Sequence, residues 1–89
     1  MRIIKIGAVW CPGCLVMKKV WNKITSDYPN LDIVNLDYDM NSNEVQKYEA
    51  GKVLPIVIFV DEDNHELERL IGEQSEDTLR RMIDKYENN

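Results

Sequence analysis

The chain has 89 residues, of which 44% are hydrophobic and 30% charged, and its formal net charge at pH 7 is −5. This length predicts a single domain over residues 1–89. The negative charge excludes nucleic acid as an expected partner, because such binding requires phosphates to be neutralised. No run approaches the roughly 20 apolar residues that span a membrane, and no signal-peptide pattern opens the sequence. We therefore expect a cytoplasmic protein without a membrane partner.

The first predicted elements are a strand and a helix. Residues 3–8 form a short apolar run, which is typical of a mostly buried strand. Pro12 suits the first position of a helix, because its fixed φ is helical and its missing N–H would be unpaired there. The segment Tyr28-Pro29-Asn30 predicts the end of this helix. Apolar residues recur at helical spacing between these points: Leu15, Val16, Val20, Trp21 and Ile24.

A second strand and a short helix are predicted next. Residues 31–36 read as a strand. Asn41, with Glu44 three residues later, resembles a capping box, in which the two side chains each accept from a backbone N–H. The short helix that this pattern opens is predicted to close at Gly51.

The remaining third of the chain predicts a hairpin and a final helix. Residues 56–60, IVIFV, give the strongest strand signal and should lie centrally in a sheet. The polar residues 61–65 predict a turn, so residues 66–71 should pair antiparallel with that strand. Ser75 is predicted to cap the last helix, whose apolar face would comprise Leu79, Met82, Ile83 and Tyr86. The order βαβαββα predicts an α/β fold in which helices flank a four-stranded mixed sheet.

Both cysteines lie in the segment VWCPGC, at the predicted start of the first helix. An i, i+3 spacing on a helix places the two Cβ atoms about 5–6 Å apart, close to disulfide geometry. The helix N-terminus favours an anion at Cys11 and should lower the pKa of its thiol toward about 7. Cys14, one turn later, should be less exposed. We therefore predict that Cys11 attacks a disulfide and that Cys14 resolves the mixed disulfide.

Two other interpretations of the cysteines remain open. Both could be buried structural residues, although a bridge across so short a loop would stabilise the fold by only about 2 kcal/mol. They could also bind a metal, but structural zinc takes four ligands. His65, in the predicted hairpin turn, is the remaining candidate ligand, and we expect it to be a solvated turn residue. A metal shared between two chains would supply the missing thiolates.

The motifs and the order of elements resemble the thioredoxin-like superfamily. The segment WCPGC at residues 10–14 is similar to the thioredoxin Trp-Cys-Gly-Pro-Cys signature with its inner pair reversed, and residues 53–57, VLPIV, match a second hallmark. The resemblance implies that the Leu54–Pro55 peptide bond is cis, faces the cysteines and leaves the Leu54 backbone free to pair with substrate. It implies that the residues contacting substrate are Trp10, Pro12, Gly13, Leu54, Pro55 and Gly72.

Three departures from the family pattern stand out. The predicted elements lack the N-terminal strand and helix of full-length thioredoxins, so the architecture is the compact one shared with glutaredoxins. Lys5 stands where thioredoxins usually carry a buried Asp, and as a cation it could favour a thiolate or extend to the surface. Pro12-Gly13 replaces Gly-Pro and so alters the helix N-terminus on which the reduction potential depends.

The resemblance implies a monomeric thiol–disulfide oxidoreductase that needs no metal or cofactor beyond its own dithiol. Its partners would be disulfide-containing proteins and a thioredoxin-reductase-like or other thiol reductant. One alternative is a glutathione-dependent glutaredoxin, although VLP at residues 53–55 differs from the expected Thr-Val-Pro. A second is a chaperone for copper or zinc, a class that uses Cys-x-x-Cys in the different order βαββαβ. A third is an adaptor that keeps the fold and the dithiol without significant turnover.

Overall fold

The computed structural model describes residues 1–87, and its elements follow the predicted order βαβαββα. The first two strands are each displaced by one residue from their predicted bounds, and the last two strands match theirs. The elements are β1 (Arg2–Gly7), α1 (Pro12–Asp27), β2 (Asp32–Asp37), α2 (Ser42–Lys47), β3 (Ile56–Val60), β4 (Glu66–Ile71) and α3 (Glu76–Glu87).

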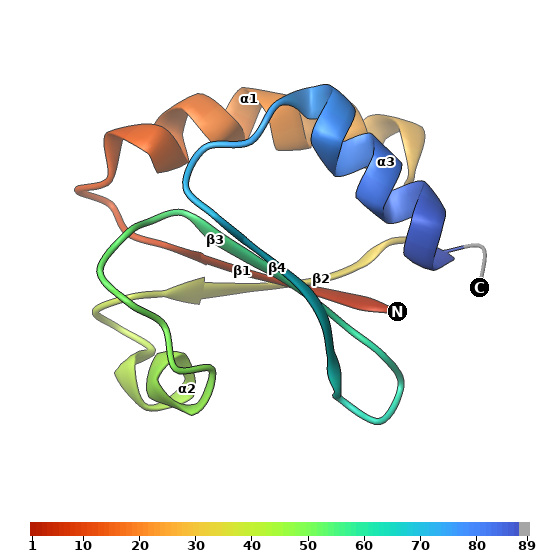
Figure 1. The fold of residues 1–89 in the computed structure, drawn as a ribbon. Helices are drawn as coiled ribbons and strands as arrows, with labels where there is room; N and C mark the ends of the chain where they lie inside the picture. The colour runs from red at the N-terminus through yellow and green to blue at the C-terminus, as the bar shows by residue number, and fades with distance from the viewer. Residues whose placement is uncertain (88–89) are drawn as a thin grey trace.

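The four strands form one mixed sheet in the order β2-β1-β3-β4. Strand β1 runs parallel to β2 and antiparallel to β3, and β3 and β4 form the predicted antiparallel hairpin. Helices α1 and α3 lie over one face of this sheet and α2 lies on the other (Figure 1). The predicted four-stranded mixed sheet flanked by helices is therefore confirmed.

Two apolar layers hold the helices on the sheet. All five residues of β3 are buried, which agrees with its predicted central position, because side chains on both of its faces are covered. One layer joins the sheet to α1 and α3 and contains Ile3, Met17, Trp21, Ile24, Val57, Phe59, Leu79 and Ile83. The other joins it to α2 and contains Ile4, Ile6, Val45, Ile56, Ile58 and Val60.

The buried face of α1 differs from the predicted one. Leu15 and Val16 are 65% and 58% exposed, although both were predicted to belong to the apolar face. Met17 is buried instead, on the same side as Trp21 and Ile24. The spacing explains the difference, because i, i+4 and i+7 share one side of a helix and this side faces the sheet. The first turn of α1 therefore leaves two large apolar side chains in solvent.

The start and end of α2 also differ from prediction. Asn41 occupies the N-cap position but makes no capping hydrogen bond, so the predicted capping box is wrong. Its Oδ1 accepts instead from the backbone N–H of Asp37 at 2.9 Å, which secures the turn before the helix. The helix ends at Lys47, and the left-handed residue after it is Glu49, with φ 53°, rather than Gly51.

The C-terminal helix begins as predicted. Ser75 Oγ accepts from the N–H of Thr78 at 3.1 Å, which satisfies one of the free donors of the first turn. Leu79 and Ile83 are buried against the sheet, and Tyr86 packs partly buried beside them. Among residues 1–87, no helix is both long enough and apolar enough to cross a bilayer.

Candidate active site

Cys11 is the N-cap of α1 and uses its sulfur as the capping acceptor. Its backbone is extended, with φ −92° and ψ 110°, and Pro12 follows at the start of the helix. The Cys11 Sγ accepts from the backbone N–H of Cys14 at 3.2 Å, and the Cys11 N–H donates to Ala8 O at 3.2 Å. Both cysteines are free thiols. The Cys11 sulfur thus lies at the end of the helix where N–H groups and the dipole favour negative charge.

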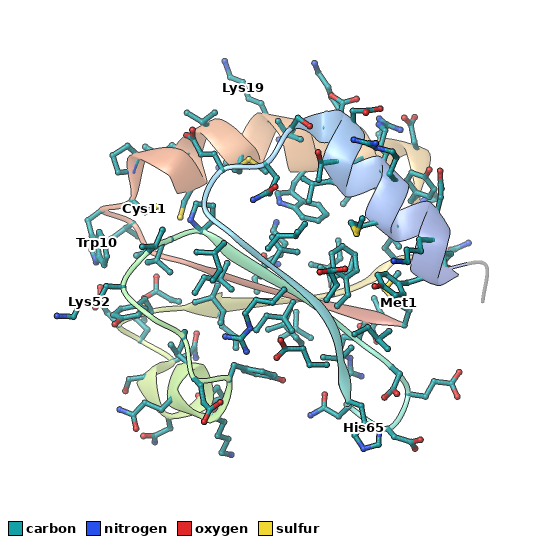
Figure 2. The ribbon with its side chains drawn as sticks, in the orientation of Figure 1. Met1, Trp10, Cys11, Lys19, Lys52 and His65 are labelled. Carbon is teal, nitrogen blue, oxygen red and sulfur yellow. The ribbon has the colours of Figure 1, made fainter. Side chains whose placement is uncertain are left out.

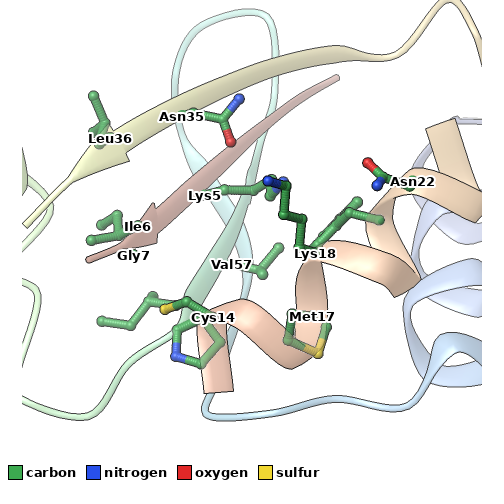
Figure 3. Close-up of a pocket in the computed structure, with 13 residues that line it drawn as sticks. Lys5, Ile6, Gly7, Cys14, Met17, Lys18, Asn22, Asn35, Leu36 and Val57 are labelled. Atoms are coloured by element: carbon green, nitrogen blue, oxygen red, sulfur yellow. The ribbon is translucent and has the colours of Figure 1, made fainter. Parts of the chain in front are cut away.

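The relative exposure of the two cysteines is the reverse of the prediction. Cys11 is only 3% exposed, whereas Cys14 is partly exposed. Cys14 borders an open cavity of about 360 Å³ beneath α1, which also touches Gly7 (Figure 3). A methyl group added at Gly7 would lie 3.1 Å from Cys14 Sγ, so the missing side chain makes room for the sulfur. The position of Cys14 in the predicted helix could not reveal this cavity, because neighbouring strands form the other walls of the cavity.

The Cys14 thiol is held in its protonated form. Burial, followed by a hydrogen bond with Cys11, raises the pKa of Cys14 from 9.0 to about 11. The thiolate form of Cys14 would attract the ammonium group of Lys5, which is half-buried and lines the same cavity. Burial lowers the pKa of Lys5, and the charge of Cys14 opposes that shift. Lys5 Nζ lies 4.7 Å from the ring centroid of Trp21, so its amino group faces the cavity and an aromatic surface.

The segment before β3 packs against the first turn of α1. The Leu54–Pro55 peptide bond is cis. A methyl group added at Gly13 would lie 3.2 Å from Pro55 Cδ, so the proline ring and the helix start are in close contact. Pro55 O accepts from the N–H of Gly72 at 2.8 Å, which joins this segment to the end of β4. The structure thus brings together Cys11, Pro12, Gly13, Cys14, Leu54, Pro55 and Gly72 as three neighbouring segments.

Glu73 is a residue of this site that the sequence reasoning missed. Gly72 adopts a left-handed φ of 87°, where a side chain would be strained, and the next residue turns toward α1. A methyl group added at Gly13 would lie 3.1 Å from Glu73 Cγ and 3.3 Å from its Oε1. A carboxyl group therefore lies beside the first turn of α1. The sequence signal that could have identified Glu73 was its position directly after Gly72, a residue already predicted to contact substrate.

Trp10 directly precedes Cys11 and lies at the surface. Its indole is 56% exposed, and its Nε1 donates to Asp39 Oδ2 at 2.7 Å. The ring meets Tyr38 edge-on, with 6.1 Å between ring centroids. Asp39 and Tyr38 follow β2, and no sequence pattern predicted that they would contact the tryptophan. The indole therefore stays partly exposed beside Cys11, the next residue in the chain.

His65 lies far from the cysteines. Figure 2 places Cys11 at one end of the sheet and His65 in the hairpin turn at the other. His65 Nδ1 lies 3.5 Å from Asp61 Oδ2, and its backbone N–H donates to Asp61 Oδ1. Within residues 1–87, the one group of three or more His, Cys, Asp or Glu side chains close enough to share a metal ion is Asp61, Asp63 and His65. Neither cysteine belongs to that group.

Exposed apolar side chains are concentrated in the segments around the dithiol. Val9 precedes the motif and is 85% exposed, and Val53 precedes the Leu54–Pro55 bond and is 60% exposed. Ile71, at the end of β4, is 56% exposed. Together with Trp10 and Leu15, these residues surround the cysteine segment with apolar surface that nothing within residues 1–87 covers.

Comparison with known proteins gives one consistent result. The family model described as Thioredoxin matches residues 1–85. The thioredoxin of Chlamydia trachomatis is 25% identical, with 96% of this chain aligned to 81% of that protein. The crystal structure of thioredoxin from Trypanosoma brucei brucei superposes with a TM-score of 0.86 at 25% identity, covering 99% of this chain and 75% of that one. Thioredoxin NaTrxh from Nicotiana alata gives a TM-score of 0.82 at 28% identity, covering 96% and 73% of the two chains.

Proposed function

Because the chain belongs to the thioredoxin family, we propose that it reduces or exchanges disulfides of other proteins through Cys11 and Cys14. The family model, the relatives and the solved structures agree that it is a thiol–disulfide oxidoreductase. The assignment of roles to individual residues rests on the geometry of the helix start. The enzyme acts from a single domain, and Cys11 is its attacking group.

The reaction has two exchange steps. The Cys11 thiolate attacks one sulfur of a substrate disulfide, which forms a bond between Cys11 Sγ and that sulfur and releases the other substrate sulfur as a thiol after it takes a proton. Cys14 then loses its proton and attacks Cys11 Sγ. This step forms the Cys11–Cys14 disulfide and releases the second substrate thiol. Two electrons and two protons pass to the substrate, and an external dithiol reductant restores the enzyme.

The single observation that carries this proposal is the hydrogen bond from Cys14 N–H to Cys11 Sγ at 3.2 Å. A backbone donor aimed at a sulfur atom stabilises the thiolate more than the thiol, because the bond is stronger to a charged acceptor. The bond also holds the two cysteines within one helical turn, where they can form a disulfide with little backbone movement. These features support Cys11 as the nucleophile and Cys14 as the resolving residue.

The segment before β3 is proposed to bind the substrate backbone. Within residues 1–87, Leu54 makes no backbone hydrogen bond outside the helices and strands, and it lies next to the Pro55 ring that contacts the helix start. An extended substrate segment can therefore pair with the free Leu54 N–H and C=O groups. The surrounding exposed apolar residues would contact the side chains that flank the substrate cysteine. Trp10, Pro12, Gly13, Leu54, Pro55 and Gly72 form this proposed surface.

The proposed partners are disulfide-containing proteins and a thioredoxin-reductase-like or other thiol reductant. We propose that no cofactor is needed, because the dithiol itself carries the two electrons. The protein is proposed to act as a monomer, and its cytoplasmic location stays a prediction.

The two alternative chemistries receive less support. A glutathione-dependent reaction is disfavoured because the matching family model and relatives are thioredoxins. A metal-binding role is disfavoured because, within the described residues, no third His, Cys, Asp or Glu side chain gathers with the two cysteines. Zinc and copper sites built from thiolates usually need further ligands.

The test is insulin reduction by the wild-type protein, Cys11→Ser and Cys14→Ser, with dithiothreitol as reductant. We expect Cys11→Ser to lose activity and Cys14→Ser to accumulate a mixed disulfide with insulin, identified by intact mass before and after reduction. Circular dichroism of each variant provides the control for folding. Equal and nearly full activity of both variants would contradict the proposed roles.

A further inference from the structure

The cavity beside Cys14 has the size and lining of a small-molecule site. Its volume of about 360 Å³ falls within the range of ligand pockets. It lies between α1 and the part of the sheet where β1 pairs with β2, and Lys5 and Asn35 are opposite each other in that pairing. Much of its wall is apolar, formed by Ile6, Met17, Trp21, Leu36, Ile56 and Val57.

The polar groups of this cavity are cations and amides. Lys5 enters from β1 and Lys18 from α1, and Figure 3 shows their side chains reaching toward one another. Asn22 and Asn35 add two side-chain amides. The chain carries 16 acidic residues, yet no Asp or Glu among residues 1–87 lines the cavity. A protein of net charge −5 therefore has a locally positive concave surface, and such a surface concentrates anions.

The two ammonium groups are unpaired with carboxylates. Within residues 1–87, Lys5 lies over the face of Trp21 and neither Lys5 nor Lys18 has an ion pair or a side-chain hydrogen bond. Two like charges that share a concave site repel each other, and one of them is half-buried. An anion between them would remove that repulsion and supply the missing acceptor for both lysines. The apolar wall beside them would hold a short hydrocarbon body.

We propose that this cavity binds a small organic anion, a carboxylate with a short apolar chain. The carboxylate lies between Lys5 and Lys18, with the Asn22 and Asn35 amides as further donors, and the chain lies along Trp21 and Val57 beside Cys14.

An anion bound in the cavity would also affect the reaction of the Cys11–Cys14 dithiol, and this consequence rests on the proposed function. The titratable groups that face Lys5 are Cys14 and Lys18, both from α1, while β2 and β3 present Asn35 and Val57. A bound carboxylate places negative charge next to Cys14 and pairs with the Lys5 charge that would stabilise its thiolate. The anion therefore opposes the loss of the Cys14 proton and slows the second exchange step.

The first experiment titrates the reduced protein with hexanoate at pH 7 and follows backbone amide signals by NMR. Hexan-1-ol and hexylammonium at the same concentrations control for charge. We expect saturable shifts at Gly7, Cys14 and Asn35 with a dissociation constant of about 1 mM, which suits a ligand of this size. Little effect is expected from the two controls.

Three lysine variants locate the anion. Lys5→Gln should weaken hexanoate binding about tenfold, because its charge-assisted hydrogen bond is partly shielded from water. Lys18→Gln should weaken it about two- to fivefold, as expected for an exposed ion pair. Lys19→Gln removes the same charge from a side chain of α1 that does not line the cavity and points away from the sheet, and should leave the affinity unchanged (Figure 2).

The proposal is overturned if hexanoate produces no saturable shifts at the cavity, if hexan-1-ol binds equally well, or if Lys19→Gln weakens binding as much as Lys18→Gln. Insulin reduction, measured with and without saturating hexanoate, separates this proposal from the proposed function. Hexanoate binding without any insulin reduction would reject the oxidoreductase roles alone. Normal insulin reduction without hexanoate binding would reject the cavity proposal alone.

Discussion

The two sides of the first turn of α1 present opposite environments to two cysteines only three residues apart. Around Gly13, Pro55 and Glu73 pack against the helix start, and the segments next to Cys11 expose apolar side chains. On the Cys14 side, an open cavity carries lysines and amides. The more exposed thiol is Cys14, yet partial burial and the hydrogen bond with Cys11 still raise its pKa. Exposure alone therefore does not identify the nucleophile.

Alkylation of the two thiols should follow their protonation rather than their exposure. With a pKa of about 11 in place of 9.0, the Cys14 thiol should react with iodoacetamide at pH 8 about 100-fold more slowly than a small-molecule thiol with an ordinary pKa. Its rate should rise about tenfold per pH unit from pH 8 to pH 10, because the reactive thiolate forms as pH approaches the raised pKa. Peptide mapping of the reduced wild-type protein measures both cysteines separately. Faster modification of Cys14 than of Cys11 at pH 8 would refute this assignment.

Filling the space beside Gly7 should disturb the Cys14 side. Gly7→Ala would place a methyl group 3.1 Å from Cys14 Sγ, so the sulfur or the helix must move. We expect the free energy of unfolding to fall by about 1–2 kcal/mol, as for other overpacked positions. Urea denaturation measures the change.

The matched control for this variant is Gly51→Ala, because a methyl group there has no neighbour within 4 Å. Its free energy of unfolding should change by less than about 0.5 kcal/mol or rise slightly. Equal stability losses in the two variants would show that close packing against Cys14 is not the cause.

Removing the charge beside the helix start should affect the Cys11 side by a smaller amount. The Glu73 carboxylate lies near the first turn of α1, where it opposes a thiolate on Cys11. Glu73→Gln should raise the rate of Cys11 alkylation at pH 7 about two- to threefold, and the gain should shrink with added salt. Glu62→Gln, in the turn between β3 and β4, removes the same charge far from the dithiol and should change nothing. A decrease in rate with Glu73→Gln would show that this carboxylate aids the attack.

Much of the fold could be predicted because local signals and burial agreed. Strand β3 has five consecutive apolar residues and is buried throughout, and Ser75 caps α3 as its residue type indicates. The predictions failed where one local sequence pattern was compatible with more than one structure. Leu15 and Val16 satisfied helical spacing but lie on the exposed side of α1, because the sheet selects the face that carries Met17. Asn41 bonds to the turn before α2, which competes with capping.

By itself the sequence determined the order of elements, the helix start at Pro12 and the placement of both cysteines in one helical turn. These features depend on backbone preferences and on the spacing of apolar residues, which act over a few positions along the chain. Only the tertiary structure decided which thiol is covered and which borders a cavity. Other strands and loops bring Gly7, Lys5, Asn35 and Pro55 to the cavity that Cys14 borders, and they bring Glu73 to the first turn of α1. Their effects depend on distances across the fold, which no local pattern encodes.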